Sequence, residues 1–224
     1  MQHRPPNPQP TMLNILVIHG YVQSADTVAH NTGPLLDALS GIAHLHYVDG
    51  PALPPTSSSR FGSSSRPWWF LGPRLEFDHA HGGDARWTEV VEWWSEELSK
   101  RRYDGVIGLS QGSAMAGLLL SMLNHPERVP NFKPALEQNL KFGIFCSGFV
   151  SHNAPHGELY GIPDIPTLHT VDDNDMIVPA SRTVELQGLC KNSVLHRHHE
   201  GHAVPVGGNF PIVMRDFILE ATKE

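Results

Sequence analysis

Cysteine is scarce in this sequence, which contains only Cys146 and Cys190 among 224 residues. Two cysteines cannot define a disulfide framework. Cys146 lies in an apolar run typical of a strand, so we expect a buried thiol there. Because nothing points to an oxidising compartment, the sequence predicts a cytoplasmic protein.

Positive charge and long apolar runs are also lacking. Lys and Arg number 16 against 23 Asp and Glu, which gives a net charge of −7 with histidine neutral. This balance argues against nucleic acid as a main partner, because phosphates require a basic face. No apolar run is long enough to span a bilayer. Residues 1–11 are rich in Pro and Gln and lack the apolar segment of a secretory signal, so we expect a flexible tail there.

What remains is the composition of one globular domain over residues 12–224. Hydrophobic residues make up 40% of the chain and charged residues 17%, which disfavours disorder. Apolar runs alternate with amphipathic stretches, a pattern typical of an α/β fold in which helices flank a mostly parallel sheet on both faces. The pattern predicts strands over 12–18, 42–48, 103–110, 142–147, 166–171 and 193–198, and helices over 24–39 (broken at Gly33-Pro34), 84–102, 113–124, 179–189 and 208–222.

One stretch, residues 50–73, interrupts this alternation after the second predicted strand. It contains several prolines and two serine runs and then reads Trp68-Trp69-Phe70. A long segment without regular structure in a domain of this size is usually functional or disordered. We interpret it as a flap-like insertion whose aromatic end packs near the functional site. The alternative is that the tryptophans are ordinary core residues.

The most informative motif is Gly108-Leu109-Ser110-Gln111-Gly112, between a predicted strand and a predicted helix. Gly-x-Ser-x-Gly in this context is typical of a nucleophile elbow, a sharp turn that exposes a serine hydroxyl above a sheet edge. Glycines are expected at 108 and 112 because side chains there would collide with neighbouring backbone. The backbone N–H of Gln111 then points toward a developing oxyanion.

The motif alone is weak, and a plain strand–turn–helix with a buried serine is the alternative. The residues that follow favour catalysis, because a serine hydroxyl needs an imidazole to accept its proton and a carboxylate to orient that imidazole. Candidates occur in the expected order after two later strands. These segments are Asp172-Asp173-Asn174-Asp175 and His199-Glu200-Gly201-His202.

A metal site is the competing interpretation of the histidine-rich segment. The histidines concerned are His196, His198, His199 and His202. No carboxylate or cysteine cluster apart from Glu200 completes a ligand set, so we predict no metal. His199 could instead line a pocket. His19, after the first strand, is expected to brace the neighbouring loop rather than to react.

The chain resembles the FSH-type serine hydrolases, a family that includes fungal polyketide thioesterases. The resemblance covers nearly all of the chain after the tail, and its ordered set of motifs is more specific than the elbow alone. The matching segments are 13–20 with Tyr21, Tyr47-Val48-Asp49-Gly50-Pro51, Gly108-Leu109-Ser110-Gln111-Gly112, Cys146-Ser147-Gly148-Phe149, Pro166-Thr167-Leu168-His169 leading to Asp175, and Gly201-His202 followed by Val204-Pro205.

The resemblance implies an α/β-hydrolase fold and a catalytic role for three side chains. Ser110 is the expected nucleophile, His202 the base and Asp175 the orienting acid. The resemblance also implies an oxyanion hole from the backbone N–H groups of Tyr21 and Gln111.

Two residues depart from the family pattern, which usually has Gly at the position of Asp172 and often at that of Glu200. The first departure leaves Asp172 and Asp173 as alternatives to Asp175. We prefer Asp175 because Ile177-Val178-Pro179 matches the register of the family.

The sequence therefore predicts a serine hydrolase of carboxylic esters or thioesters with small or medium acyl groups, without a cofactor. A small molecule or a carrier-bound acyl chain fits as substrate, and the oligomeric state is left open. The alternatives are a non-catalytic ligand-binding member of the fold and an acyltransferase that uses the same residues. The tentative pocket residues are Trp68, Trp69, Phe149 and Val204.

Overall fold

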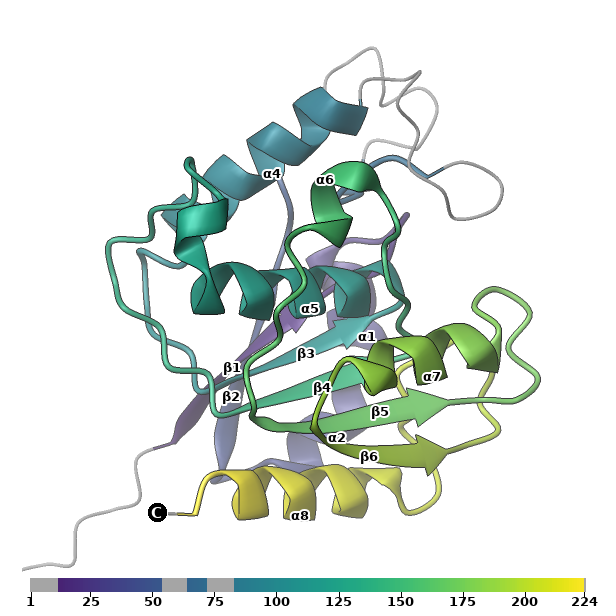
Figure 1. Cartoon of the computed structure of the whole chain (residues 1–224). Helices are drawn as coiled ribbons and strands as arrows, with labels where there is room; N and C mark the ends of the chain where they lie inside the picture. Colours follow the sequence, from purple (N-terminus) through teal and green to yellow (C-terminus); the bar gives the residue numbers. More distant parts are fainter. Residues whose placement is uncertain (1–11, 54–63, 72–82, 224) are drawn as a thin grey trace, which may run out of the picture.

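The computed structural model describes residues 12–53, 64–71 and 83–223. Six parallel strands form one sheet with the order β2-β1-β3-β4-β5-β6. The predicted tail over 1–11 and residues 54–63 and 72–73 of the predicted insertion lie outside the described residues. Figure 1 shows helices above and below this sheet, which is the predicted α/β architecture.

All six predicted strands are present, and each predicted helical stretch contains a helix. The strands are β1 (Leu13–Ile18), β2 (Ala43–Val48), β3 (Gly105–Leu109), β4 (Phe142–Cys146), β5 (Pro166–Val171) and β6 (Asn192–Arg197). The helices are α1 (Ala25–Asn31), α2 (Gly33–Ala38), α4 (Gly83–Glu97), α5 (Gln111–Asn124), α6 (Ala154–Gly157), α7 (Ala180–Gly188) and α8 (Phe210–Ala221), with a short 3₁₀ turn η2 (Pro126–Arg128). The break at Gly33-Pro34 separates α1 from α2.

Two hydrophobic cores cover the two faces of the sheet. In β1, Leu16 and Ile18 join the core that α4, α5 and α7 complete, whereas Ile15 and Val17 join the core beneath α1, α2 and α8. Successive residues of a strand point to opposite faces, so a strand covered on both sides must be apolar throughout. This explains why the first strand is an almost continuous apolar run.

The aromatic end of the insertion is part of the larger core. Trp68 and Trp69 are fully buried. The Trp68 ring stacks on His19 and on Trp94, with centroids 4.9 Å and 5.1 Å away. The Trp69 ring lies edge-on to Trp87, 6.1 Å away. The two tryptophans therefore tie the insertion to α4 and to the end of β1.

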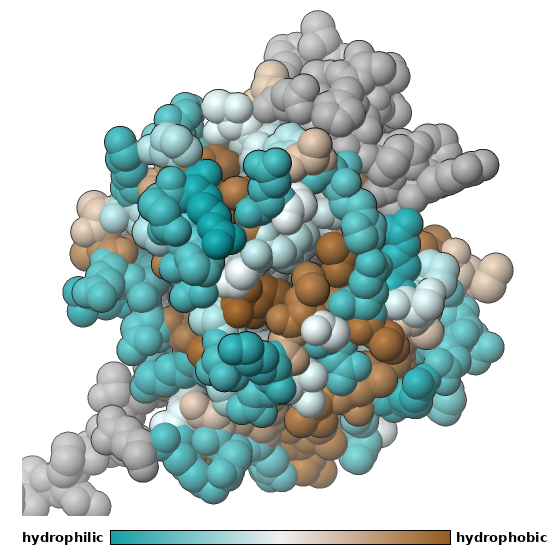
Figure 2. Space-filling view, viewed as in Figure 1, coloured by the Kyte–Doolittle hydropathy of each residue, from teal (hydrophilic) through white to brown (hydrophobic). Residues whose placement is uncertain are grey.

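Apolar side chains reach the surface in the middle and lower part of the face that Figure 2 shows. Among the described residues, no helix is both long enough and apolar enough to traverse a bilayer. Figure 2 shows hydrophobic residues reaching the surface among hydrophilic ones on the face in view. Val184 of α7 and Val194 of the edge strand β6 are about half exposed. Single exposed apolar side chains of this kind are common on folded proteins.

Three buried histidines should make the fold sensitive to acid. Burial lowers the pKa of His19 and of His169 to about 4 and that of His156 to about 3. An unfolded histidine titrates near 6.5, so the unfolded chain binds more protons than the folded chain between these values. Their contribution to stability is therefore complete above pH 6.5 and is lost as the pH falls toward 4.

We predict that the free energy of unfolding falls by about 4 kcal/mol per pH unit near pH 5. Urea unfolding curves between pH 7 and pH 4.5 measure this slope. His169→Gln should remove about one third of it, because one of three protonation sites is lost. A wild-type slope near zero in this range would contradict the assignment.

Candidate active site

Ser110 occupies the sharp turn between β3 and α5. Its φ is +55° and its ψ is −118°, and a positive φ is uncommon for a residue with a Cβ. The rest of the described chain contains one other non-glycine residue with positive φ, Ser147, at the end of the neighbouring strand β4. Such strain concentrates at functional sites, where the surrounding structure holds it in place.

Glycine is required on both sides of Ser110, as expected from the motif. A Cβ on Gly108 would lie 2.4 Å from the carbonyl oxygen of Gly112. A Cβ on Gly112 would lie 2.2 Å from the carbonyl oxygen of Ile18, the last residue of β1. These neighbours are backbone atoms in regular elements and cannot move aside. Helix α5 therefore begins in direct contact with the end of β1.

The start of α5 presents N–H groups near Ser110. The carbonyl oxygen of Ser110 accepts the bonds from Ser113 (3.0 Å) and Ala114 (3.2 Å), which leaves the earlier N–H groups of the helix without intrahelical acceptors. The Gln111 carboxamide is engaged elsewhere, because it accepts from the N–H of Trp68 (3.1 Å) and donates to the carbonyl of Trp69 (2.8 Å). The side chain of Gln111 thus anchors the insertion.

The side chains of His19 and Tyr21 brace the loop that follows β1 and to which both residues belong. The His19 ring contacts the carbonyl of Gly20 through Nδ1 at 2.8 Å. Because burial lowers its pKa to about 4, His19 is neutral at pH 7 and fits a bracing role. The Tyr21 hydroxyl accepts from the N–H of Leu71 at 3.0 Å and donates to its carbonyl at 3.2 Å.

His202 and Asp175 are brought together from loops after different strands. His202 Nδ1 lies 2.7 Å from Asp175 Oδ2. The other carboxylate oxygen accepts from the N–H groups of Ile177 (2.8 Å) and Val178 (2.9 Å). Burial by itself would raise the pKa of Asp175, but the bonds from His202, Val178 and Ile177 outweigh it and lower that pKa. Asp175 is thus held as a carboxylate against the ring.

The two alternative acids point elsewhere. Asp172 Oδ1 accepts from the N–H of Asn174 at 2.8 Å, and its Oδ2 accepts from the N–H of Gly201 at 2.7 Å. Asp173 is exposed and pairs with Arg197 at the surface. Among these three carboxylates, Asp175 alone contacts the imidazole of His202.

Ser110 is largely buried, at 8% exposed, whereas the His202 side chain is partly exposed. Within the described residues, Ser110 Oγ forms no hydrogen bond with His202, and neither Ser110 Oγ nor His202 Nε2 is among the buried atoms that lack a partner. The His202 side chain is 21% exposed. Contacts between a nucleophile and its base are often longer in a structure without substrate than in the reacting complex.

A cleft of about 160 Å³ lies beside His202, between α1 and the loop after β6. Val204 is the one tentative pocket residue that lines it. Trp68, Trp69 and Phe149 are instead buried in the larger core. The remaining lining residues are Gln23, Val28, Asn31, Thr32, Leu109, Glu200, Ala203 and Val206.

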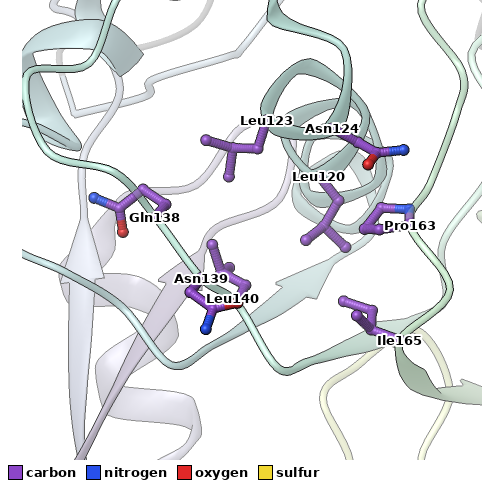
Figure 3. A pocket seen from close by; sticks show the side chains of 8 residues that line it. All are labelled: Leu120, Leu123, Asn124, Gln138, Asn139, Leu140, Pro163 and Ile165. Atoms are coloured by element: carbon purple, nitrogen blue, oxygen red, sulfur yellow. The ribbon is translucent and has the colours of Figure 1, made fainter.

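A second cavity, of about 190 Å³, lies toward the opposite end of the sheet (Figure 3). Its walls come from the end of α5 and from segments that precede β4 and β5, such as Leu140 and Ile165. None of its lining residues carries a nucleophile or an ionisable group. Ser110, in contrast, follows the carboxyl end of β3, where sites in α/β folds assemble.

The histidines around β6 do not form a metal site in the part of the chain that the structure describes. No group of three or more His, Cys, Asp or Glu side chains there could hold a metal ion. His202 is engaged with Asp175, and His198 Nδ1 accepts from the N–H of Glu200 at 3.2 Å.

Two features of the site escaped the sequence analysis. Ser147 follows Cys146, whose carbonyl accepts the N–H of Ser110 at 2.8 Å, so two strained serines lie at the ends of adjacent strands. The bridging role of Asp172 between two loops was also missed. For Ser147, the available signal was the Ser-Gly pair directly after a buried strand. The bridge made by Asp172 had no such signal, because it depends on contacts between distant segments.

Known proteins resemble this chain in sequence and in fold. A family model described as serine hydrolase (FSH1) matches residues 9–210. The esterase OVCA2 of Xenopus tropicalis is 29% identical over 213 residues, which cover 88% of each chain. The solved structure of Zea mays acyl-protein thioesterase 2 has a TM-score of 0.61 at 18% identity and covers 97% of this chain and 96% of that chain. A Bacillus cereus carboxylesterase gives 0.62 at 18% identity, over 94% and 89% of the two chains.

The parallel sheet, the elbow after β3 and the structural matches define the α/β-hydrolase fold. The match over residues 9–210 gives the narrower assignment: the chain belongs to the FSH1 serine hydrolase family. The fold, the family and the enzyme class expected from the sequence are therefore confirmed.

The close contact at Gly112 can be tested with a matched glycine in the same helix. Gly112→Ala should destabilise the protein by about 3 kcal/mol, because its Cβ meets backbone. Gly117→Ala should be neutral or stabilise by up to about 1 kcal/mol, since the nearest atom to its Cβ, Leu186 Cδ1, is 3.5 Å away. Urea unfolding measures both. Equal stability of the two variants would show that α5 does not depend on the contact with β1.

Proposed function

We propose that Ser110, His202 and Asp175 form a catalytic triad that hydrolyses carboxylic esters or thioesters through an acyl-enzyme intermediate. The observation that carries the proposal is the 2.7 Å contact between His202 Nδ1 and Asp175 Oδ2. The loops that carry these two residues follow the carboxyl ends of β6 and β5, as Ser110 follows that of β3. Family membership supports the use of serine as nucleophile.

In the first half-reaction, Ser110 Oγ attacks the acyl carbonyl carbon while His202 Nε2 accepts the hydroxyl proton. The bond to the leaving oxygen or sulfur then breaks, and His202 returns the proton to that atom. In the second half-reaction, water attacks the acyl-serine by the same route and releases the acid and free Ser110. Asp175 holds the Nδ1–H tautomer and stabilises the imidazolium formed in each step. No cofactor takes part.

The oxyanion of each tetrahedral intermediate requires donors that are already in place. We assign this role to the backbone N–H groups of Gln111 and Tyr21. The first belongs to the start of α5, where the helix dipole adds a partial positive charge. The second belongs to the loop that His19 and Trp68 brace.

The proposed substrate has a small or medium acyl group. The cleft beside His202 is small, and valine, leucine and alanine side chains supply part of its lining. Proteins similar to this chain carry the names esterase and, among structures of the same fold, acyl-protein thioesterase, so both ester and thioester substrates belong to the proposal. Acyl transfer to an alcohol is the second candidate, because the same acyl-enzyme serves both reactions.

Removal of the triad members tests the reaction. Ser110→Ala should lower kcat about 10⁴-fold or more, and Asp175→Asn should lower it by a similar order. Asp173→Asn is the matched control, because it changes a neighbouring exposed carboxylate and should leave kcat unchanged. Hydrolysis of p-nitrophenyl butyrate measures all three. Substantial turnover by Ser110→Ala would eliminate Ser110 as nucleophile.

A fluorophosphonate probe separates a catalytic protein from a non-catalytic binder. An activated serine reacts covalently with this probe, whereas an ordinary serine does not. We expect rapid labelling of the wild type and none of Ser110→Ala. Unlabelled wild-type protein would favour the binding alternative.

A chain-length series tests the proposed substrate size. We expect kcat/KM to peak at short or medium p-nitrophenyl esters and to fall at least about tenfold between octanoyl and palmitoyl esters, since added methylenes exceed the cleft. Acyl-pantetheine thioesters of the same lengths compare the two leaving atoms. A maximum at palmitoyl would refute the size assignment, and ester products from an added alcohol would favour acyl transfer.

A further inference from the structure

His202 belongs to a connection, residues 198–209, that contains no helix or strand between β6 and α8. Gly201 precedes His202 with a φ of +70°, and Gly208, next to the last residue of the connection, has a φ of +56°. Glycine restricts the backbone least of all residues. Additional contacts must therefore hold the base in position.

The first such contact comes from Asp172, the residue directly after β5. Its carboxylate joins two loops, because Oδ1 accepts from the N–H of Asn174 at 2.8 Å and Oδ2 accepts from the N–H of Gly201 at 2.7 Å. Asp172 is 3% exposed. One buried carboxylate thus connects the loop that carries Asp175 to the residue that precedes His202.

The charge state of Asp172 suits this role. The bonds from the N–H groups of Asn174 and Gly201 lower its pKa, against the opposing effect of burial. The side chain is therefore ionised at neutral pH and can accept through both oxygens. Hydrogen bonds to an ionised acceptor are shorter and stronger than those between neutral groups.

The second contact comes from Glu200 and closes the same loop on the other side of His202. Its Oε2 accepts from the N–H of Val206 at 3.0 Å, and its Oε1 accepts from the N–H of Gly207 at 3.1 Å. Glu200 also lines the cleft beside His202. The base therefore lies in a loop whose two ends are held by carboxylates.

We propose that Asp172 and Glu200 are positioning residues for His202: Asp172 fixes the His202 loop against the Asp175 loop, and Glu200 closes the His202 loop on itself, so that the imidazole keeps its orientation toward Ser110. The inference rests on the proposed triad. Neither carboxylate touches the reacting atoms, and each acts through the backbone that carries the base. A displacement of about 1 Å in a catalytic group can cost about 100-fold in rate.

Asp172→Ala tests the main contact, and Asp173→Ala is its matched control. Both variants remove a carboxylate from the same loop, but Asp173 is exposed and makes a surface pair with Arg197, which contributes little to stability. We expect Asp172→Ala to lower kcat about 10- to 100-fold with KM changed by less than about threefold. Asp172→Asn, which keeps one acceptor oxygen, should recover part of the loss.

Glu200 is tested in the same way, with Glu200→Gln beside Glu200→Ala. The glutamine retains an acceptor, so its kcat should lie between those of the wild type and the alanine variant. Equal kcat in Glu200→Ala and the wild type would remove Glu200 from the proposal. Each kinetic value is corrected for the folded fraction measured by circular dichroism in the same buffer.

A spectroscopic readout separates positioning from general destabilisation. The proton between His202 Nδ1 and Asp175 gives a low-field NMR resonance when the contact is well ordered. We expect this resonance to broaden or exchange faster in Asp172→Ala and to be unchanged in Asp173→Ala. This holds even if Ser110 proves not to be the nucleophile, because the resonance depends only on the His202–Asp175 contact.

The proposal for Asp172 is overturned by either of two results in folded Asp172→Ala. One is a kcat within about twofold of that of Asp173→Ala. The other is an unchanged His202 resonance. If Asp172→Ala lost activity while Ser110→Ala kept the activity of the wild type, the proposed function would be refuted. The NMR measurement would then decide the positioning proposal by itself.

Discussion

The contact between the start of α5 and the end of β1 is the constraint on which the site depends. At Gly112 the helix lies so close to the carbonyls of Ile18 and His19 that no side chain fits. This contact places Ser110 in its strained turn and directs the first N–H groups of α5 toward the space above the sheet. The strain at Ser110 is maintained because two buried cores, one on each face of the sheet, hold β1, β3 and α5 together.

Parallel topology supplies the rest of the site. The ends of β5 and β6 lie side by side, because Val171 pairs with Arg197 and its carbonyl accepts the N–H of His198. The loops that follow these strands therefore begin next to each other, and the Asp175–His202 contact joins them. Coupled loops of this kind hold a carboxylate against an imidazole without regular structure, provided that side chains satisfy their backbone groups.

The sequence predicted the strands, the helices and the elbow well, because each depends on local pattern. Apolar runs define β1 and β4, and the glycines at 108 and 112 define the turn. The sequence could not predict that the Gln111 carboxamide bonds to the backbone of Trp68 and Trp69, or that Asp172 bonds to the backbone of Gly201. These are contacts between segments tens of residues apart, and an Asp or Gln side chain has similar local preferences whether or not such a partner exists.

The most direct test of the account is to trap the acyl-enzyme. Wild-type protein is mixed with p-nitrophenyl butyrate, quenched with acid within milliseconds and analysed by intact mass and peptide mapping. The account predicts a butyryl adduct on Ser110 of the wild type and no adduct in Ser110→Ala. An adduct on another residue would contradict the account. So would wild-type turnover during which Ser110 stays unmodified at every time point, together with full activity of Ser110→Ala.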